Sequence, residues 1–296
     1  MEEAFSKLSR TATALALLAA AFGAAGQTTY TFTTFSVPNS TYTDAIAINE
    51  NGDVTGYYGM DGITLFQGFL RSASGQITTI SYPGQSVTGA YGLNDFMVVA
   101  GDYATGNSGA GMLYHNGAYK SIVIEGQPTA VNDINDYGYY AGSIGNSNST
   151  GYVASPSGQI TTFNYPGAYS TGVSWIKNNG DVIGTYQDND GNFHTFLWTA
   201  ASGYKTLSIP GVPGATVVDI NSSGAIVGGY FNGATDRGFV YQNGKFQIVQ
   251  VLGSNNSSVG AINNKGQLVG SYSIPGSMYM GFIATPVAAS PPGAAR

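Results

Sequence analysis

The sequence contains no cysteine, and this absence limits both its stability and its chemistry. Without thiols a chain has no disulfide, no cysteine nucleophile, no iron–sulfur cluster and almost no route to a structural zinc site. The 296 residues must therefore gain their stability from a large apolar core.

Charged residues are also scarce. They make up 9% of the chain, where about 25% is usual, and the formal net charge is −6. The few Lys and Arg residues are scattered along the sequence, whereas proteins that bind nucleic acid gather basic side chains in patches that meet phosphates. We therefore expect no nucleic acid as a partner.

Several enzyme motifs are missing as well. The chain has no Gly-x-Ser-x-Gly elbow, no P-loop and no dinucleotide glycine fingerprint. Its two histidines, His115 and His194, lie far apart in the sequence and lack the spacing of zinc ligands. The acidic loop that begins at Asp188 lacks the glycine and the terminal glutamate of an EF-type calcium loop. We expect neither a cofactor nor a metal.

No apolar run reaches the length of about 20 residues that a membrane-spanning helix needs. The apolar stretch 12–22 follows Lys7 and Arg10 and precedes small residues, which is the order of a cleaved export signal. Residues 1–26 are therefore predicted to be a signal peptide, with a short buried helix as the alternative. Residues 285–296 are predicted to form a flexible Pro- and Ala-rich tail. We expect a secreted or periplasmic monomer without a membrane anchor.

What the chain does contain is glycine and aromatic residues. It has 43 Gly, 21 Tyr and 14 Phe, and 43% of its residues are hydrophobic. Disordered chains have few aromatic residues and a high net charge. This composition indicates a compact, turn-rich fold.

One unit is repeated six times along the chain. Its landmark is an Ile-Asn-x-x-Gly element, whose second position is held by Asn49, Asn94, Asn135, Lys177, Asn221 and Asn263. Seven residues later every unit has a glycine, at Gly56, Gly101, Gly142, Gly184, Gly228 and Gly270. The Asn-x-x-Gly element is predicted to be a tight hairpin, in which Asn hydrogen-bonds its own backbone and Gly supplies a positive φ.

Each unit contains four short runs of β-branched and aromatic residues between turn residues, which predicts four antiparallel strands. Four-stranded units of this length, placed around an axis, form the blades of a β-propeller. The sixth unit ends after three strands, and residues 30–38 resemble a fourth strand. We predict an all-β, six-bladed propeller over residues 27–284, whose N-terminal strand completes the last blade.

The repeat resembles an extracellular family named for a His-Ala-Phe (HAF) motif, whose units combine Ile-Asn-x-x-Gly-x-Val-x-Gly-x-Tyr with a later His-Ala-Phe-Leu-Trp. The nearest match to the second half is His194-Thr195-Phe196-Leu197-Trp198. The other units place Gln67, Ala110, Thr150, Arg237 and Met280 at the histidine position. The resemblance implies secretion and a repeat architecture, and it carries no activity or catalytic residue.

Departures from the repeat are the places to look for function, because the repeat itself encodes the scaffold. Two residues before the landmark, blades three to five carry Asp133, Trp175 and Asp219 where the other blades have Ala or Gly. Lys177 replaces the landmark asparagine in blade four. We expect these side chains on the channel wall, where they form a sugar-binding site, an acid/base pair for glycosidic cleavage, or a polar network that only fills the channel.

Two further candidates lie toward the opposite face. His194 stands at the start of a third strand beside the acidic loop, as a catalytic candidate or a polar loop residue. A ring of tyrosines, two residues after the repeated glycine, is either a ligand-binding ring or packing between blades. These are Tyr58, Tyr103, Tyr186, Tyr230 and Tyr272. Asp44 and the pair Asp236-Arg237 complete the polar residues of that face and are expected to be solvated loop charges.

Three functions remain open from the sequence. The leading prediction is a secreted binding module for extracellular carbohydrate or another surface protein, which rests on abundant tyrosine, low charge and the predicted compartment. The second is a polysaccharide-active hydrolase or lyase that uses Asp133 and Asp219 or His194. The third is a purely structural surface protein.

Overall fold

The computed structural model describes residues 28–60, 65–105, 108–277 and 279–287. The predicted signal peptide and nearly all of the predicted tail therefore lie outside the described residues. Within these ranges the chain forms strands and turns and no helix, so none of its elements is a helix that could cross a membrane.

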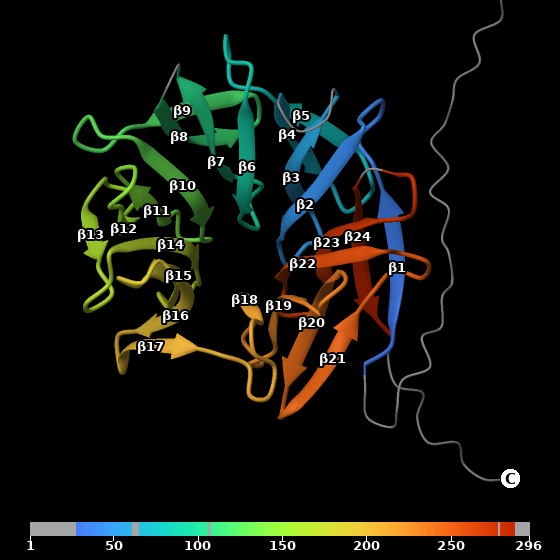
Figure 1. Ribbon diagram of the computed structural model, residues 1–296. Helices are drawn as coiled ribbons and strands as arrows, with labels where there is room; N and C mark the ends of the chain where they lie inside the picture. Colours follow the sequence, from blue (N-terminus) through green and yellow to red (C-terminus); the bar gives the residue numbers. More distant parts are fainter. Residues whose placement is uncertain (1–27, 61–64, 106–107, 278, 288–296) are drawn as a thin grey trace, which may run out of the picture.

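The strands form six four-stranded antiparallel sheets, arranged as blades around a channel (Figure 1). Blade 1 consists of β2 (Tyr42–Ile48), β3 (Val54–Gly59), β4 (Phe66–Arg71) and β5 (Ile77–Ile80). Blade 2 consists of β6 (Thr88–Leu93), β7 (Val99–Thr105), β8 (Ser108–His115) and β9 (Ala118–Ile122). Blade 3 consists of β10 (Thr129–Ile134), β11 (Tyr140–Ile144), β12 (Thr150–Ala154) and β13 (Ile160–Phe163).

The remaining blades follow the same order from the channel outward. Blade 4 consists of β14 (Ser170–Ile176), β15 (Val182–Gln187), β16 (Phe193–Thr199) and β17 (Gly203–Leu207). Blade 5 consists of β18 (Thr216–Ile220), β19 (Ile226–Phe231), β20 (Asp236–Gln242) and β21 (Lys245–Val249). Blade 6 consists of β22 (Asn256–Ile262), β23 (Leu268–Ser273), β24 (Met280–Pro286) and β1 (Tyr30–Phe35). The six-bladed prediction is confirmed.

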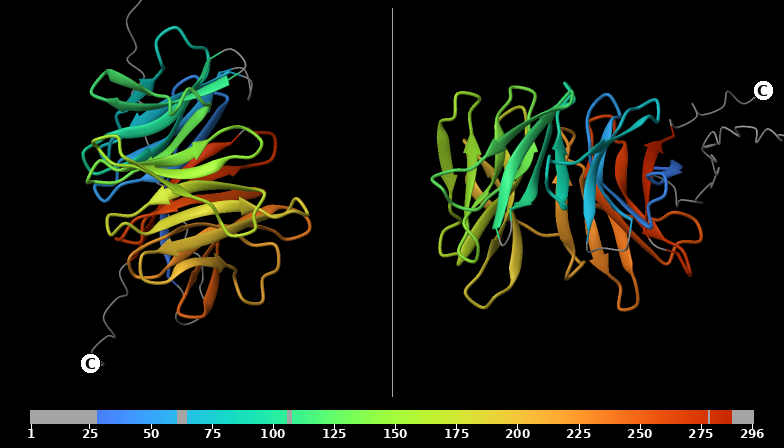
Figure 2. Two further views of the ribbon diagram at one scale, coloured as in Figure 1. Left: turned by 90° about the vertical axis from the view of Figure 1, so that its left-hand side faces the viewer. Right: turned by 90° about the horizontal axis from the view of Figure 1, so that it is seen from above.

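The N-terminal strand completes the last blade, as the sequence predicts. β1 pairs with β24 from Tyr30↔Pro286 to Phe35↔Gly281, and Figure 1 shows the blue strand beside the red one. β24 ends at Pro286, two residues beyond the predicted end of the propeller. This closure removes two sheet edges that would otherwise be open to pairing with other chains. The side views of Figure 2 show the blades standing next to one another.

A bulge in the innermost strand explains the repeated glycine. In every blade the register between the first two strands shifts at one point, as between Val131 and Asp133. Next to the shift the Ala130 carbonyl oxygen lies against Gly142, where a Cβ would be 1.9 Å from that oxygen. Only glycine fits there. The equivalent glycines of the other blades meet a carbonyl in the same way, at Gly56, Gly101, Gly184, Gly228 and Gly270.

The core lies between neighbouring blades. The central residue of each third strand is fully buried, and these residues are Phe69, Met112, Tyr152, Phe196, Phe239 and Phe282. Burial of one such side chain contributes about 2 to 3 kcal/mol. The preceding residue is glycine in five blades, and in four of them it lies against the first strand of the next blade, as Gly111 does against Val131. Blade 4 has Thr195 at this position.

Candidate functional site

A ladder of asparagine side chains ties the blades together around the hairpin end of the channel. Each asparagine Nδ2 donates to the backbone oxygen at the same position of the next blade, at 3.1 to 3.3 Å. The five bonds run from Asn49 to Asn94, Asn94 to Asn135, Asn135 to Lys177, Asn221 to Asn263 and Asn263 to Asn49. The Oδ1 atoms accept backbone N–H groups of their own hairpins, as Asn135 does from Tyr137 and Tyr139, which confirms the predicted role of the landmark residue.

A second set of bonds runs one residue further along the hairpins. In each, a backbone N–H donates to a side-chain oxygen of the next blade, at 2.8 to 2.9 Å. These bonds run from Glu50 to Asp95, Asp95 to Asp136, Asp136 to Asn178, Ser222 to Asn264 and Asn264 to Glu50. Among the described residues neither set has a member that joins blade 4 to blade 5.

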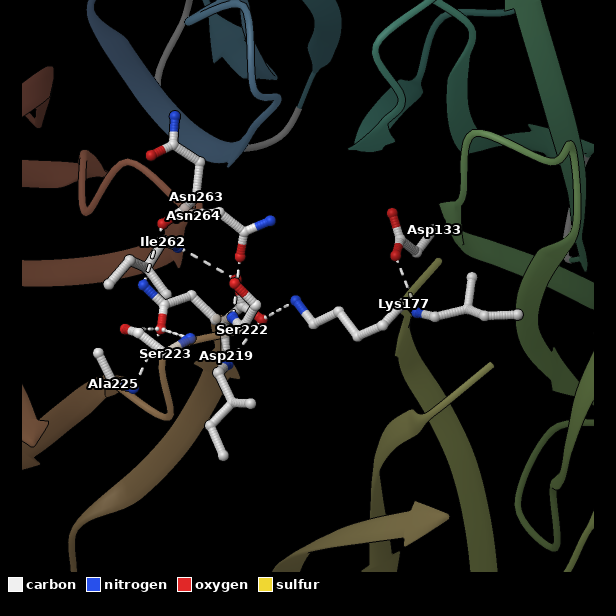
Figure 3. Close-up of polar contacts among 12 residues, drawn as sticks. Asp133, Lys177, Asp219, Ser222, Ser223, Ala225, Ile262, Asn263 and Asn264 are labelled. Atoms are coloured by element: carbon white, nitrogen blue, oxygen red, sulfur yellow. Dashed lines mark hydrogen bonds and ion pairs between the residues drawn. The ribbon is translucent and has the colours of Figure 1, made fainter. Parts of the chain in front are cut away.

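Blades 4 and 5 are joined at the channel by an ion pair instead. Lys177 Nζ lies 2.5 Å from Asp219 Oδ1, as Figure 3 shows. The lysine takes the position of the ladder asparagine, and its long side chain reaches across to the neighbouring blade. On the third strand Thr195 Oγ1 donates to the Val217 backbone oxygen at 3.0 Å.

The channel opens at this end into a cavity of about 560 Å³, which we call the channel chamber. All six innermost strands contribute to its wall, and the four residues predicted from the repeat, Asp133, Trp175, Lys177 and Asp219, all line it. Blade 4 contributes two more residues, Ile183 of β15 and Leu197 of β16, so the chamber extends along the face of blade 4. The structure therefore brings the predicted channel residues into one cavity.

Asp219 is nearly fully buried and well supplied with donors. Its side chain is 3% exposed. Besides Lys177 it accepts backbone N–H groups from Ile220 at 2.7 Å and from Ile262 of the next blade at 3.1 Å. A buried carboxylate is tolerated when it is paired and hydrogen-bonded in this way. Asp219 thus links three blades, which fits the network alternative of the sequence analysis.

Asp133 has weaker support. Its Oδ2 accepts the backbone N–H of Ile176 in blade 4 at 2.9 Å, and among the described residues no Lys or Arg lies within ion-pair distance of it. Burial raises the pKa of Asp133 to about 7, because that bond and the more distant Lys177 charge only partly offset the loss of water. Ionisation of Asp133 in the folded protein is therefore less favourable than ionisation of a solvent-exposed aspartate.

Trp175 lies between these residues and is 9% exposed. Its indole packs among apolar channel residues that include Ile183 and Leu197. It does not present an open ring face for a sugar to stack on. The chamber thus holds a buried acid, an ion pair whose carboxylate is buried, and an indole, with most of its polar atoms already bonded to the blades.

A second, smaller cavity of about 170 Å³ lies at the opposite, loop-bearing face between blades 3 and 4, and we call it the loop-face pocket. Its lining carries no charged side chain. It consists of Asn132, Ser143, Ser149, Ser170, Gly172, Ser174, Thr185, Tyr186, Gln187 and Phe193. Phe193 is 73% exposed, whereas the other aromatic residue, Tyr186, is partly buried.

Four hydroxyl groups of the loop-face pocket have no hydrogen-bond partner within the described part of the chain, namely Ser143, Ser170, Ser174 and Thr185. None of them is a buried, unsatisfied atom, so water reaches all four. Two other lining residues do bond the backbone: Asn132 Nδ2 donates to the Val173 oxygen and Ser149 to that of Thr171. Sequence reasoning missed this pocket, because scattered serines give no motif.

His194 lies beside this pocket at the acidic loop. Its Nε2 is 2.8 Å from Asp188 Oδ2, and its ring stacks on Tyr186. The hydrogen bond with His194 holds the pKa of Asp188 well below its usual range. Asp188 also accepts backbone N–H groups from Asp190 and Asn192, so the pair closes the loop tip.

The five repeated tyrosines lie in four separate core clusters. Their hydroxyls bond the outermost strand of the same blade in three cases, as Tyr58 does with Thr79 and Tyr103 with Ser121. Tyr103 also stacks on Tyr82 at 3.6 Å. This arrangement corresponds to the packing alternative.

A carboxylate that the sequence suggested to be a solvated loop charge is a partly buried strand residue. Asp44 lies in β2, and its Oδ2 accepts the hydroxyls of Tyr42 and Tyr57 at 3.1 and 3.2 Å. Burial raises the pKa of Asp44. On the next blade the Tyr91 hydroxyl donates to Asp102 in the same manner, and burial raises the pKa of Asp102 too. The expectation for Asp44 was wrong because a carboxylate in a short polar segment gives no signal of burial.

Comparison with known proteins identifies the fold. AofleA from Arthrobotrys oligospora is 14% identical, with a TM-score of 0.54, over 91% of this chain and 93% of its own. TolB from Acinetobacter baumannii is 15% identical, with a TM-score of 0.52, over 84% of this chain. The Trypanosoma rangeli sialidase is 10% identical, with a TM-score of 0.51, over 85% of this chain.

This chain spans 65% of the TolB chain and 55% of the sialidase chain. No family model matches the sequence, and no curated protein matches it. Membership of the HAF repeat family therefore stays a prediction from the repeated residues. At these identities the likeness shows the fold alone, and that fold is a β-propeller.

Proposed function

We propose that this protein is a carbohydrate-binding propeller whose ligand is a neutral sugar held in the loop-face pocket. The observation that carries the proposal is the set of four hydroxyls without protein partners that converge on a small pocket beside an exposed phenylalanine. Hydroxyl groups both donate and accept, as the hydroxyls of a sugar do. An aromatic ring at the rim gives the apolar face of the sugar a surface to cover.

The chemistry of the lining sets the ligand class. No charged side chain faces the pocket, so nothing in it favours a phosphate, a carboxylate or a cation. Its volume of about 170 Å³ is below the range of drug-sized ligand pockets, which limits the occupant to one small ring. The channel chamber is less suited to a sugar, because most of its polar atoms bond the blades.

The predicted compartment is part of the proposal. A protein exported by residues 1–26 meets extracellular polysaccharide before any intracellular substrate. One of the structures with this fold is a sialidase, an enzyme named for a sugar, although folds of this kind carry many functions. Binding is proposed in preference to cleavage, because no carboxylate or histidine lines the pocket to act as an acid or base on its hydroxyls.

The test is a panel of neutral and acidic glycans, with the variant Gly172→Val. A Cβ at Gly172 would lie 3.8 Å from Ser143 Cβ and 3.9 Å from Thr185 Oγ1, so a side chain introduced there occupies the pocket and its Cβ makes only ordinary contacts. We expect neutral sugars to bind and the variant to lose at least about tenfold in affinity at an unchanged melting temperature. Gly229→Val is the matched control, since its Cβ also meets only an ordinary contact, on blade 5.

A second pair of variants tests the aromatic rim. Phe193→Ala removes the proposed platform, whereas Phe231→Ala removes an aromatic side chain of similar exposure outside the pocket. Only the first should weaken binding. Absence of binding across the panel, or binding that Gly172→Val leaves intact, overturns the proposal.

A further inference from the structure

The channel chamber has the features of a separate ligand site. Its volume of about 560 Å³ lies within the range of pockets for organic ligands. Its apolar lining includes Leu93, Trp175, Ile183, Leu197, Ile220 and Ala261. Such pockets combine an apolar body with a few placed polar groups that fix the orientation of the ligand.

The two aspartates of the chamber, Asp219 and Asp133, differ in the number and charge of their bonding partners. Asp219 has Lys177 and two backbone donors, whereas Asp133 has the Ile176 N–H and no cation within ion-pair distance in the described structure. Figure 3 shows Asp133 beside the backbone of Lys177, whose side chain runs away from it toward Asp219. A buried carboxylate without a paired cation is costly, and a cation supplied by a ligand would relieve that cost.

The mouth of the chamber carries charges of the same sign. Glu50, Asp95, Asp136 and Asp181 line it, and Lys177 is the only basic residue of the lining. Lys177 is already paired with Asp219. A mouth lined by carboxylates raises the local concentration of cations and repels anions.

We propose that the channel chamber binds an organic ammonium ion with an apolar body, its ammonium group on the Asp133 carboxylate and its body against Trp175. The apolar wall, to which Trp175 contributes, adds burial of the ligand's apolar body. This site lies at the opposite face from the loop-face pocket, so it is independent of the proposed carbohydrate function.

The protonation of Asp133 gives the site a pH dependence. The groups that face this carboxyl are Lys177 and Asp219, together with the backbone amides of Ile176 and Ile134. Its pKa of about 7 means that part of the population is protonated at neutral pH. The ammonium ion binds the ionised form, so binding releases a proton and affinity rises with pH until the ligand itself loses its charge.

Three probes with one apolar body separate the contributions. Hexylammonium, hexanol and hexanoate differ in the head group, and titration calorimetry with the full chain measures each affinity. We expect hexylammonium to bind about 10- to 100-fold more tightly than hexanol, and hexanoate to bind least. In a Trp198→Phe background, fluorescence of the remaining Trp175 reports occupancy of the chamber.

Asp133→Asn tests whether the ammonium group of the ligand binds the Asp133 carboxylate. The variant removes the charge, while its amide oxygen can still accept the Ile176 N–H. It should abolish the preference for hexylammonium and leave hexanol binding unchanged. Asp190→Asn removes the same charge from an exposed loop and should leave both unchanged.

The wild-type chain gives an independent readout if the Asp133 variant does not fold. Calorimetry at neutral pH in two buffers of different ionisation enthalpy should show proton release on binding of hexylammonium. Equal affinity for hexanol, tighter binding of hexanoate, no proton release, or no binding by any probe overturns the proposal. Failure of the sugar experiments leaves it unaffected.

Discussion

The junction between blades 4 and 5 differs from the other five junctions of the ring. Elsewhere an asparagine amide bonds the next blade, and in most junctions a third-strand glycine lets the next blade come close. Here Lys177 replaces the asparagine and Thr195 replaces the glycine, and an ion pair makes the link at the channel. Residues that follow the repeat therefore let neighbouring blades pack closely. The residues that depart from it change the distance between blades 4 and 5.

The exceptional junction is also where the channel chamber extends outward. Only blade 4 contributes residues of its second and third strands, Ile183 and Leu197, to the lining. Thr195 Oγ1 donates to the Val217 backbone oxygen, and we infer that this side chain keeps β18 farther from blade 4 than a glycine would. The departures from the repeat thus create the space that a ligand can use, and the following predictions test this comparison.

The largest effect is expected when the exceptional residue is moved to an ordinary junction. In Gly111→Thr the new Cβ would lie 2.3 Å from Val131 Cγ2, so blades 2 and 3 must separate. We expect a loss of about 3 kcal/mol or more in the free energy of unfolding. The reverse change, Thr195→Gly, loses one hydrogen bond and about 1 kcal/mol.

Urea denaturation of the two variants measures this difference. Equal losses would show that the blade 4 junction is packed as closely as the others. A folded and stable Gly111→Thr variant would also contradict the argument.

Loss of a ladder asparagine should cost less. Asn94→Ala removes the Nδ2 bond to Asn135 and two bonds that Oδ1 accepts from Phe96 and Val98. The backbone groups left behind are partly buried, and we expect a loss of about 2 kcal/mol in a urea titration. A loss below about 0.5 kcal/mol would mean that water replaces the ladder.

The matched change at the exceptional junction is Lys177→Asn. It restores the repeat but leaves the buried Asp219 without its ammonium partner, which is destabilising. Adding Asp219→Ala gives the pair of residues found in blades 1 and 6. We expect the double variant to be more stable than Lys177→Asn alone, and the opposite order would show that the ion pair is not the link we describe.

The blades and their closure could be predicted because the repeat encodes them directly. Asn94 shows how robust this is: its hairpin lacks the usual glycine, yet Met97 takes a φ of 58° and closes the same kind of turn. Spacing also placed Asp133 and Asp219 on one channel wall. It could not show that each would bond a backbone N–H of the next blade, because that depends on the distance between blades.

The loop-face pocket was beyond sequence reasoning for a related reason. Its hydroxyls come from strands of two blades, and each serine alone resembles a solvated residue. Asp44 was expected to be solvated, and the structure shows it bonded to tyrosine hydroxyls. Its partner Tyr57 lies opposite it in the register between β2 and β3, which the sequence alone does not give. Which polar groups keep free bonding capacity is a property of the assembled ring.

The stability of the fold should depend on the protonation of Asp133, which is buried and has no cation at bonding distance within the described structure. The folded-state pKa of Asp133 is about 7 and lies above its unfolded value of about 4. Its contribution to stability is therefore complete below about pH 4 and is lost as the pH rises through about 7. We expect wild type to lose about 1 kcal/mol relative to Asp133→Asn between about pH 6 and about pH 7. Parallel stability curves would show that the carboxyl is not held protonated.

The smallest expected change in stability concerns the second set of bonds between neighbouring hairpins. This set, too, has no member between blades 4 and 5 in the described structure. The backbone N–H of Asn178 has no acceptor at position 222, where serine is shorter than the Asp, Asn or Glu of the other acceptor positions. Ser222→Asn supplies that acceptor. An exposed bond of this kind should add about 0.5 kcal/mol in a urea titration.

Combining the change with Thr195→Gly separates two causes of the missing bond. If the short serine alone is responsible, Ser222→Asn stabilises the wild-type chain fully. If the threonine holds the blades apart, the gain is seen only in the Thr195→Gly background, because only then does the introduced asparagine side chain reach Asn178. A gain in neither background would mean that the junction is set by the Lys177–Asp219 pair, and the role assigned to Thr195 would be wrong.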